Sequence, residues 1–334
     1  MGQVHVFRGR PANYMTEIPA IGYRRFGPPN VLEHVDLPMP KVGANQVLVA
    51  VEAIGLNPLD YRLRRGEMVP FIMPGQVRVI ASDFAGRVHA TGTKVRRWAV
   101  GDRVHGMVNQ VFTGSAAQLI AVADKVLAPC PEGVEMEVAA TVPLASLTAW
   151  QALTECAVVQ PGMRVLVNGA SGGVGVYGVQ IARALGAEVT AVTSYRNLDW
   201  MSGIGATDTL DYTTTDFTAG PTQFDVIFDA YGNRSFGRVR SALAKDGTYI
   251  TTIPGVRGYL PMLVNGLRAQ KAKVVVVRGR GEHLGRIGAM MSAGQIRPIV
   301  DRVYPVDELE AAYGHLESKR ACGKIGLLCP WTPP

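Results

Sequence analysis

The residues from Arg164 to Arg196 constrain the fold of this chain more than any other stretch. An apolar run at 165–167 leads into a glycine cluster at 169–175, and apolar residues at helical spacing follow as far as Gly186. A second apolar run occupies 189–192. Strand, glycine turn, helix and strand in this order form the βαβ unit that binds dinucleotides. The turn lets the backbone approach a pyrophosphate, and the helix N-terminus offers free N–H groups and a positive dipole end.

Composition excludes several other classes of protein. The chain has 334 residues, a length that accommodates two domains. Its net charge is +7, but the basic residues are scattered, so no stretch indicates nucleic-acid binding. Its 4 cysteines lie far apart without metal-ligand spacing, which favours a reduced, cytoplasmic setting over a disulfide framework. The longest uncharged stretch, 138–154, contains Pro143 and several hydroxyl residues, and we expect it inside a soluble protein rather than in a membrane.

Two types of pattern divide the chain. After a loose leader at 1–19, short apolar runs separated by glycine and proline predict a compact β-rich domain. From about residue 150, apolar runs alternate with helical patterns, which predicts a doubly wound parallel sheet. We therefore expect an α/β fold with a β-rich domain at 1–149, a nucleotide-binding domain at 150–278, and a tail at 279–334 that packs back on the first domain. Ligand clefts commonly lie at such junctions.

Six short motifs follow one another in a characteristic order: NPLDY from Asn57, SDFAG from Ser82, GDRV from Gly101, PLASLTA from Pro143, GASGGVG at 169–175, and GKI at 323–325. Together they resemble the medium-chain dehydrogenase/reductase superfamily, in its zinc-free quinone oxidoreductase and enoyl reductase branch. The resemblance implies a GroES-like catalytic domain, a Rossmann domain for the cofactor and a homodimer. Such dimers join sheet edges, and the apolar run from Lys273 to Arg278 is the predicted edge strand.

The positions at which related alcohol dehydrogenases hold zinc carry other residues here. The resemblance places a cysteine ligand near Asn57 and a histidine ligand near Ser82, and neither is present. The four closely spaced cysteines of a structural zinc lobe are also missing. We therefore expect no metal and no alcohol oxidation by the zinc route. Adding hydride to an already polarised, conjugated acceptor needs less help.

The residues after the second strand indicate which cofactor binds. NAD-preferring folds carry an acidic residue about 20 positions past the glycines, whereas this chain has Ser194, Arg196 and Asn197, with no carboxylate until Asp199. A hydroxyl, a guanidinium and an amide suit a 2′-phosphate, so we predict NADPH. The remaining cofactor contacts are implied by the resemblance and comprise Thr148, Ala170, Ser171, Gly172, Gly173, Val174, Gly175, Tyr212, Ile253 and Lys324.

The resemblance places residues 57–61 along the cleft. Asn57 could hydrogen-bond the carbonyl oxygen of an acceptor, and Tyr61 could donate a proton. We expect Asp60 to cap the helix that begins near Leu59. Enoyl-thioester reductases carry a tyrosine proton donor where this chain has Met68, and a thioether cannot donate. A further departure is Ala81, which replaces a usual glycine.

These residues predict a zinc-independent oxidoreductase that transfers hydride from NADPH to a small conjugated carbonyl compound or a quinone. The missing tyrosine favours these acceptors over thioesters. Two alternatives stay open: an NADPH-binding sensor or structural protein without turnover, and a dedicated enoyl reductase that tailors a polyketide-like intermediate. The sequence does not select a substrate, because pocket loops such as 254–270 follow no general code.

Overall fold

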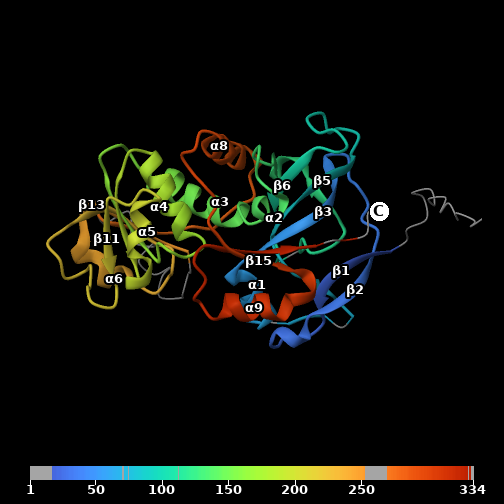
Figure 1. The fold of residues 1–334 in the computed structure, drawn as a ribbon, viewed down its shortest axis with the longest axis horizontal. Helices are drawn as coiled ribbons and strands as arrows, with labels where there is room; N and C mark the ends of the chain where they lie inside the picture. Colours follow the sequence, from blue (N-terminus) through green and yellow to red (C-terminus); the bar gives the residue numbers. More distant parts are fainter. Residues whose placement is uncertain are drawn as a thin grey trace, which may run out of the picture.

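The computed structural model describes residues 17–331 except 70, 74, 112, 253–268 and 330. Two lobes lie side by side in Figure 1, one built mainly from the middle of the chain and the other from both of its ends. Helix α3 (Pro143–Gln151) runs between them, and its first residue is a proline, which is favourable at the first position of a helix.

The first lobe contains a six-stranded parallel sheet. Its strands lie in the spatial order β11 (Asp208–Asp211), β10 (Glu188–Thr193), β9 (Arg164–Asn168), β12 (Phe224–Asp229), β13 (Leu243–Thr251) and β14 (Lys271–Val274). From β9 the chain adds β10 and β11 on one side and then β12, β13 and β14 on the other, so the strand order reverses between β9 and β12. Parallel sheets bind ligands at such a switch point, beyond the carboxyl ends of their strands. The predicted doubly wound sheet is confirmed.

Both faces of this sheet are covered, which explains its continuous apolar runs. On one face, Val165 and Val167 of β9 pack into a core that includes Val176 of α4 (Gly175–Ala184). On the other face, Leu166 packs into a core that includes Phe236 of α6 (Phe236–Val239). The short helix α5 (Leu198–Ser202) follows β10.

The second lobe contains two sheets. The larger has the order β15 (Val300–Pro305), β16 (Lys324–Leu328), β3 (Gln46–Leu56), β5 (Asp83–Thr91), β6 (Arg103–Met107) and β8 (Leu127–Pro129), with β7 (Leu119–Ala123) also on β3. The smaller consists of β2 (Glu33–Pro38), β1 (Glu17–Tyr23) and β4 (Arg78–Val79). Ile325 of β16 pairs antiparallel with Leu56 of β3, so the end of the chain completes a sheet begun near its start.

Four further helices lie on or beside the second lobe: α1 (Pro58–Arg64), α2 (Met136–Ala139), α8 (Gly281–Ser292) and α9 (Leu309–Glu317). Helix α9, drawn in red, lies beside the blue α1 from the opposite end of the sequence (Figure 1). This pairing contributes to holding α1, whose first turn carries the predicted catalytic residues.

Two predicted segments need correction. Residues 17–19 are not part of a loose leader, because β1 already begins at Glu17 and pairs with β2 from that residue onward. The predicted edge strand from Lys273 to Arg278 is displaced, because β14 runs from Lys271 to Val274. Its partner β13 ends at Thr251, which pairs with Val274. Among the described residues, the pairing between the two strands therefore ends at Val274.

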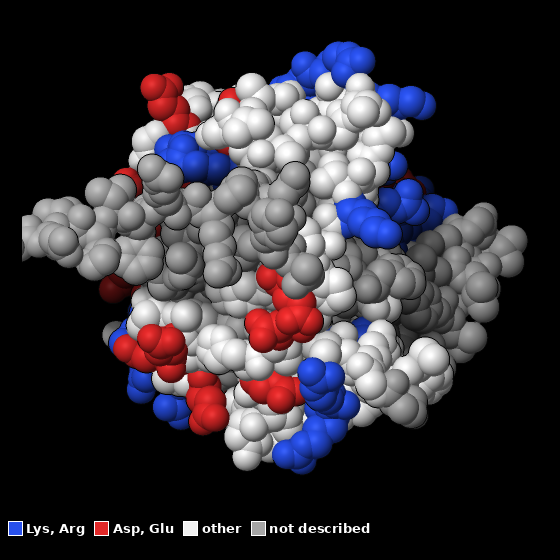
Figure 2. Space-filling view, turned by 90° about the vertical axis from the view of Figure 1, so that its right-hand side faces the viewer, with Lys and Arg blue, Asp and Glu red and all other residues white. Residues whose placement is uncertain are grey.

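Figure 2 shows the end of the molecule that carries the second lobe. Acidic and basic side chains both occur on this face, and within its described part no continuous basic surface is seen. Within the same described residues, no helix combines the length and the apolar character that crossing a bilayer requires.

Candidate active site

The glycine turn between β9 and α4 is built for close backbone approach. Gly169 has φ +77°, a left-handed conformation that glycine adopts without steric cost. A Cβ atom on Gly175 would lie 2.1 Å from the Gly169 carbonyl oxygen, so no larger residue fits where the helix begins. By contrast, a Cβ atom on Gly172 would meet only that same oxygen, at 3.3 Å, so the tip of the turn is open.

The start of α4 offers hydrogen-bond donors beside this opening. Among the described residues, the backbone N–H of Val174 has no hydrogen-bond partner, whereas that of Gly173 faces the Gly323 carbonyl in the bridge between Gly172 and Gly323. Unsatisfied N–H groups at a helix N-terminus form a site for a pyrophosphate. The turn therefore fits a dinucleotide. Ala170, predicted to belong to it, is fully buried, and its N–H donates to Val192.

A small polar network joins the ends of β9 and β10. The hydroxyl of Ser171 accepts from Thr193 Oγ1 at 2.7 Å and from Asn197 Nδ2 at 3.1 Å. Asn197 Nδ2 also lies 3.3 Å from Ser194 Oγ. The structure thus brings together three of the predicted cofactor residues, Ser171, Ser194 and Asn197, at the edge where a nucleotide ribose would lie.

The charged and aromatic members of this region are less tightly held. Arg196 is exposed and makes no hydrogen bond or ion pair with any described residue. Tyr212 is also exposed, and its N–H donates to Thr193. Sequence reasoning missed Asp211, whose carboxylate accepts from Thr213 and from the N–H of Tyr195, contacts that lower its pKa. It lies 36 residues beyond Gly175, outside the usual spacing for a ribose-binding carboxylate.

Two other predicted cofactor residues have separate outcomes. Thr148 lies in α3, nearly buried, where its hydroxyl donates to the Leu144 carbonyl at 2.7 Å, so its side chain is engaged within its own helix. Ile253 lies outside the described residues.

Lys324 links the glycine turn to the second lobe. Its neighbour Gly323 donates its N–H to the Ser171 carbonyl at 2.9 Å and forms a bridge with Gly172. The ammonium group of Lys324 donates to the Leu56 carbonyl at 2.9 Å and to Asn57 Oδ1, and lies 3.7 Å from Asp83 Oδ2. The side chain is only 3% exposed.

Asn57 and Asp60 form the start of α1. Asn57 is the N-cap, and its N–H donates to Asp60 Oδ2 at 2.7 Å, so the prediction that Asp60 has a capping role is confirmed. The side-chain amide of Asn57 donates to Asp83 Oδ2 at 2.9 Å and lies 3.3 Å from the Gly55 carbonyl. With its oxygen on the N–H of Ala81, the amide of Gln110 donates to Asp60 Oδ1 at 2.6 Å.

Burial shifts the pKa values of this cluster strongly. Desolvation raises the pKa of Asp60 to about 8, although the Asn57 N–H and the charges of Lys324 and Arg64 oppose it. Desolvation also raises the pKa of Asp83 to about 6, against the favourable charge of Lys324. The pKa of Lys324 is lowered by desolvation, and the charge of Asp83 opposes that shift. At neutral pH, these values leave Asp60 mainly protonated and Asp83 mainly ionised.

Tyr61 and Met68 lie nearer the surface. Tyr61 is half-buried, its ring lies 5.1 Å from the Arg65 guanidinium, and its hydroxyl makes no hydrogen bond with a described residue. Met68 is 47% exposed. Within the described part of the chain, the Tyr61 hydroxyl therefore has no partner, whereas both donor directions of the Asn57 amide are used inside the protein.

Sequence reasoning missed three members of this cluster. Asp83 was noted only as part of a motif, although its Oδ1 accepts from the Leu144 N–H at 2.7 Å, at the start of α3. Gln110 had no local signal. Tyr177 of α4 is fully buried, and its hydroxyl has no partner among the described residues. Desolvation raises the pKa of that hydroxyl, and the charge of Asp83 adds to the shift.

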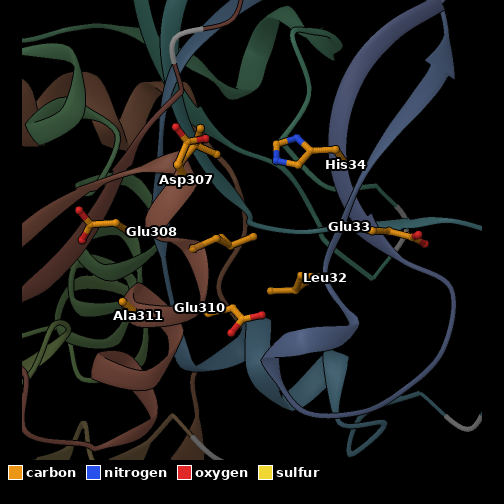
Figure 3. A pocket seen from close by; sticks show the side chains of 9 residues that line it. Leu32, Glu33, His34, Asp307, Glu308, Glu310 and Ala311 are labelled. Atoms are coloured by element: carbon orange, nitrogen blue, oxygen red, sulfur yellow. The ribbon is translucent and has the colours of Figure 1, made fainter.

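Two further features were compared with this cluster: possible metal ligands and a hollow on the surface. Among the described residues, no group of three or more His, Cys, Asp or Glu side chains is arranged to hold a metal ion. A surface hollow of about 480 Å³ lies on the second lobe, with Glu33 and His34 on one side and Asp307, Glu308 and Glu310 on the other (Figure 3). Its acidic lining would repel an anionic dinucleotide, and it shares no residue with the glycine turn.

Comparisons with known proteins agree with this geometry. Residues 43–132 match the family model for the alcohol dehydrogenase GroES-like domain, and residues 204–327 match the one for zinc-binding dehydrogenases. A chloroplastic quinone oxidoreductase, QR1, of Triphysaria versicolor is 31% identical, covering 88% of this chain and 93% of that protein. A chloroplastic NADPH-dependent alkenal/one oxidoreductase of Arabidopsis thaliana is 29% identical, covering 94% and 80%.

A solved structure extends the similarity to the whole fold. The quinone oxidoreductase from Coxiella burnetii superposes with a TM-score of 0.84 at 29% identity, covering 94% of this chain and 99% of that one. The GroES-like region, the parallel sheet with its glycine turn, and relatives matched over nearly their full length lead to one conclusion. This chain is an oxidoreductase with a nicotinamide cofactor and belongs to the medium-chain dehydrogenase/reductase superfamily, in its quinone oxidoreductase branch.

Proposed function

We propose that this protein uses NADPH to reduce a small conjugated carbonyl compound or a quinone. The observation that carries the proposal is the open glycine turn, which lies against the Gly323–Lys324 segment that reaches Asn57 at the start of α1. This arrangement joins a dinucleotide site to a buried polar cluster. Relatives named for quinones and for alkenals and alkenones supply the acceptor class.

Different residues of the chain have different proposed roles in such a reaction. The bound cofactor supplies the hydride, so the protein binds, orients and handles protons. The turn at 169–175 and the start of α4 bind the pyrophosphate. The second lobe presents α1, whose Tyr61 hydroxyl is the proposed donor of the proton that balances hydride addition.

Asn57 has a different proposed role from Tyr61. Both of its amide donor directions are used within the protein, on Asp83 and on the Gly55 carbonyl. A hydrogen bond from Asn57 to an acceptor carbonyl therefore requires one of these internal bonds to be exchanged. We propose that Asn57 makes this exchange only when an acceptor is bound.

The preference for NADPH over NADH rests on Ser194, Arg196 and Asn197 after β10. The free guanidinium of Arg196 suits a 2′-phosphate, while the carboxylate of Asp211 is engaged by Thr213 and the Tyr195 N–H. Tyr212 completes the proposed phosphate site from the end of β11.

The direct test is oxidation of NADPH and NADH by purified protein with a panel of enones and quinones. We expect turnover with NADPH on at least one acceptor class, and a lower KM for NADPH than for NADH. NADPH binding with no turnover across the panel would instead support the alternative of a sensor or structural protein. Turnover confined to enoyl thioesters would support the dedicated enoyl reductase.

We further propose a homodimer in which β14 pairs with its copy, and a cytoplasmic location. Among the described strands, β14 is the last of its sheet and pairs with β13. The resemblance to a family whose dimers join sheet edges supports this pairing. A monomeric mass by light scattering would contradict the dimer.

A further inference from the structure

Lys324 is the first residue of β16 in the second lobe, and the stem of its side chain passes the glycine turn of the first lobe before the ammonium group reaches the start of α1. Its backbone neighbour Gly323 is hydrogen-bonded to Ser171 of the glycine turn. A Cβ atom on Gly173 would lie 2.9 Å from Lys324 Cδ, so the aliphatic stem passes directly across the turn. The ammonium group then lies in the second lobe, at Leu56 and Asn57.

The three protons of this ammonium group face three acceptors. These are the Leu56 carbonyl, Asn57 Oδ1 and the Asp83 carboxylate. Because all three acceptors belong to the second lobe, the charge of Lys324 is not directed at a pyrophosphate in the turn. The bond to Oδ1 also fixes the orientation of the Asn57 amide, whose nitrogen consequently faces Asp83.

Asn57 transmits this restraint to α1. As N-cap it begins the helix, and its N–H holds the Asp60 carboxylate, which Gln110 holds from the other side. The next residue is Tyr61, the proposed proton donor. One side chain therefore connects the dinucleotide turn to the helix that carries the acceptor-side groups.

We propose that Lys324 is a positioning residue: it holds the first turn of α1 at a fixed place relative to the glycine turn, and so sets the acceptor against the nicotinamide rather than binding the dinucleotide itself. The inference rests on the proposed function for the identity of the two ligands. Hydride transfer depends steeply on placement of the reacting atoms, so a loosened α1 lowers the rate more than it lowers cofactor affinity.

Lys324→Met tests this proposal, because methionine keeps the stem and removes the charge. We expect kcat at saturating NADPH to fall by at least about tenfold, while the Kd for NADPH changes by less than about threefold. In the ligand-free variant, amide hydrogen exchange should rise across 56–66 and stay unchanged across 168–176. An increased Kd with unchanged kcat, or no change in any of the three, overturns the proposal.

The matched control is Lys245→Met, which removes the same charge at an exposed position and should behave as the wild type. If Lys324→Met does not fold, Asp83→Asn serves instead, because it keeps the shape of the carboxylate and weakens the hold on Lys324 and Asn57. We expect the same pattern from it, and wild-type kcat in Asp83→Asn overturns the proposal.

Failure of the proposed function is separable from failure of this inference. A wild-type protein that neither binds NADPH nor reduces any acceptor refutes the function. The exchange comparison in the ligand-free proteins still decides whether Lys324 restrains α1, since it requires no cofactor.

Discussion

Arg196 lies exposed in the short 3-10 turn Tyr195–Asn197, without a partner among the described residues. A guanidinium that is free in the protein can engage a phosphate without first losing another contact. We expect Arg196→Ala to raise the KM for NADPH about tenfold, because a charge-assisted hydrogen bond at an exposed site contributes about 1.5 kcal/mol. The KM for NADH should change by less than about twofold, since NADH lacks the 2′-phosphate.

Steady-state kinetics with both cofactors measure this difference. Arg25→Ala, an exposed arginine in the loop after β1, is the control and should leave both KM values unchanged. Equal effects of Arg196→Ala on NADPH and NADH would contradict a phosphate-specific role.

Ala81 illustrates a residue whose conformation the sequence did not reveal. Its φ is +64°, a region that costs an alanine about 1–2 kcal/mol. Ala81→Gly relieves this strain, but it loses a fully buried methyl, worth about 0.8 kcal/mol, and adds about 0.4–1 kcal/mol of unfolded-state entropy. These terms nearly cancel, so we expect the free energy of unfolding to change by less than about 0.5 kcal/mol.

Ala81→Val should be different, because a β-branched residue fits the left-handed region poorly and this position is fully buried. We expect a loss of more than about 2 kcal/mol in denaturant unfolding. Ala121→Val, on strand β7, is the control. Equal stabilities of the two valine variants would show that Ala81 is not strained.

Asp60 should make stability depend on pH. Its pKa in the folded state is raised to about 8 from 3.8. Between these values the folded protein binds a proton that the unfolded chain has released, so the free energy of unfolding falls as pH rises, by up to about 1.4 kcal/mol per pH unit. Lys324, Arg64 and Asp83 face this carboxyl, and the two cations reduce the effect without reversing it.

Asp60→Asn mimics the protonated acid, so we expect it to lose less stability than the wild type between pH 5 and about pH 8. Thermal unfolding at several pH values measures the slope. Asp246→Asn, at an exposed carboxylate, is the control. An unchanged slope in Asp60→Asn would show that Asp60 does not remain protonated in the folded protein.

At the scale of elements, α1 packs against α9, which stabilises its position. Arg64 of α1 is fully buried, donates to Glu317 of α9 and to the Gly27 carbonyl, and lies 5.3 Å from the ring of Tyr313. Removal of one partner from a buried ion pair leaves the other charge unpaired. We expect Glu317→Ala to lower the free energy of unfolding by about 3 kcal/mol, measured by denaturant titration.

Glu310→Ala is the matched control, since Glu310 lies exposed on the same helix. A loss no larger in Glu317→Ala than in Glu310→Ala would mean that the pair contributes little to the attachment of α1.

The elements also separate what the sequence could predict from what it could not. The βαβ unit was predictable because its periodicity changes sharply at the glycines. The extent of β14 was not predictable, because it depends on where its partner β13 ends. Helix α6 ends at Val239, because a 3-10 turn at Arg240–Ala242 leads directly into β13.

The site divides in the same way. Ser194 and Asn197 lie within four residues of each other, so local spacing revealed them. The contact between Lys324 and Asn57 joins residues 267 apart, and Gln110 reaches Asp60 from a loop with no motif of its own. Such contacts are set by how distant elements of the second lobe pack, and no local pattern encodes that packing.

At the scale of the whole molecule, hydrogen bonds join the two lobes at several points. Gly323 is bonded to the glycine turn, the next residue but one, Ile325, pairs with Leu56, and the N–H at the start of α3 is bonded to Asp83. Loss of either lobe would therefore expose the buried cluster around Lys324.

We expect the lobes to unfold together, in one calorimetric transition. NADPH at 100 times its Kd should raise the stability of this whole unit by about 2.7 kcal/mol, and the single peak should move to higher temperature without splitting. Two transitions, of which NADPH shifts only one, would mean that the lobes fold independently and that the Lys324 contact couples them only weakly.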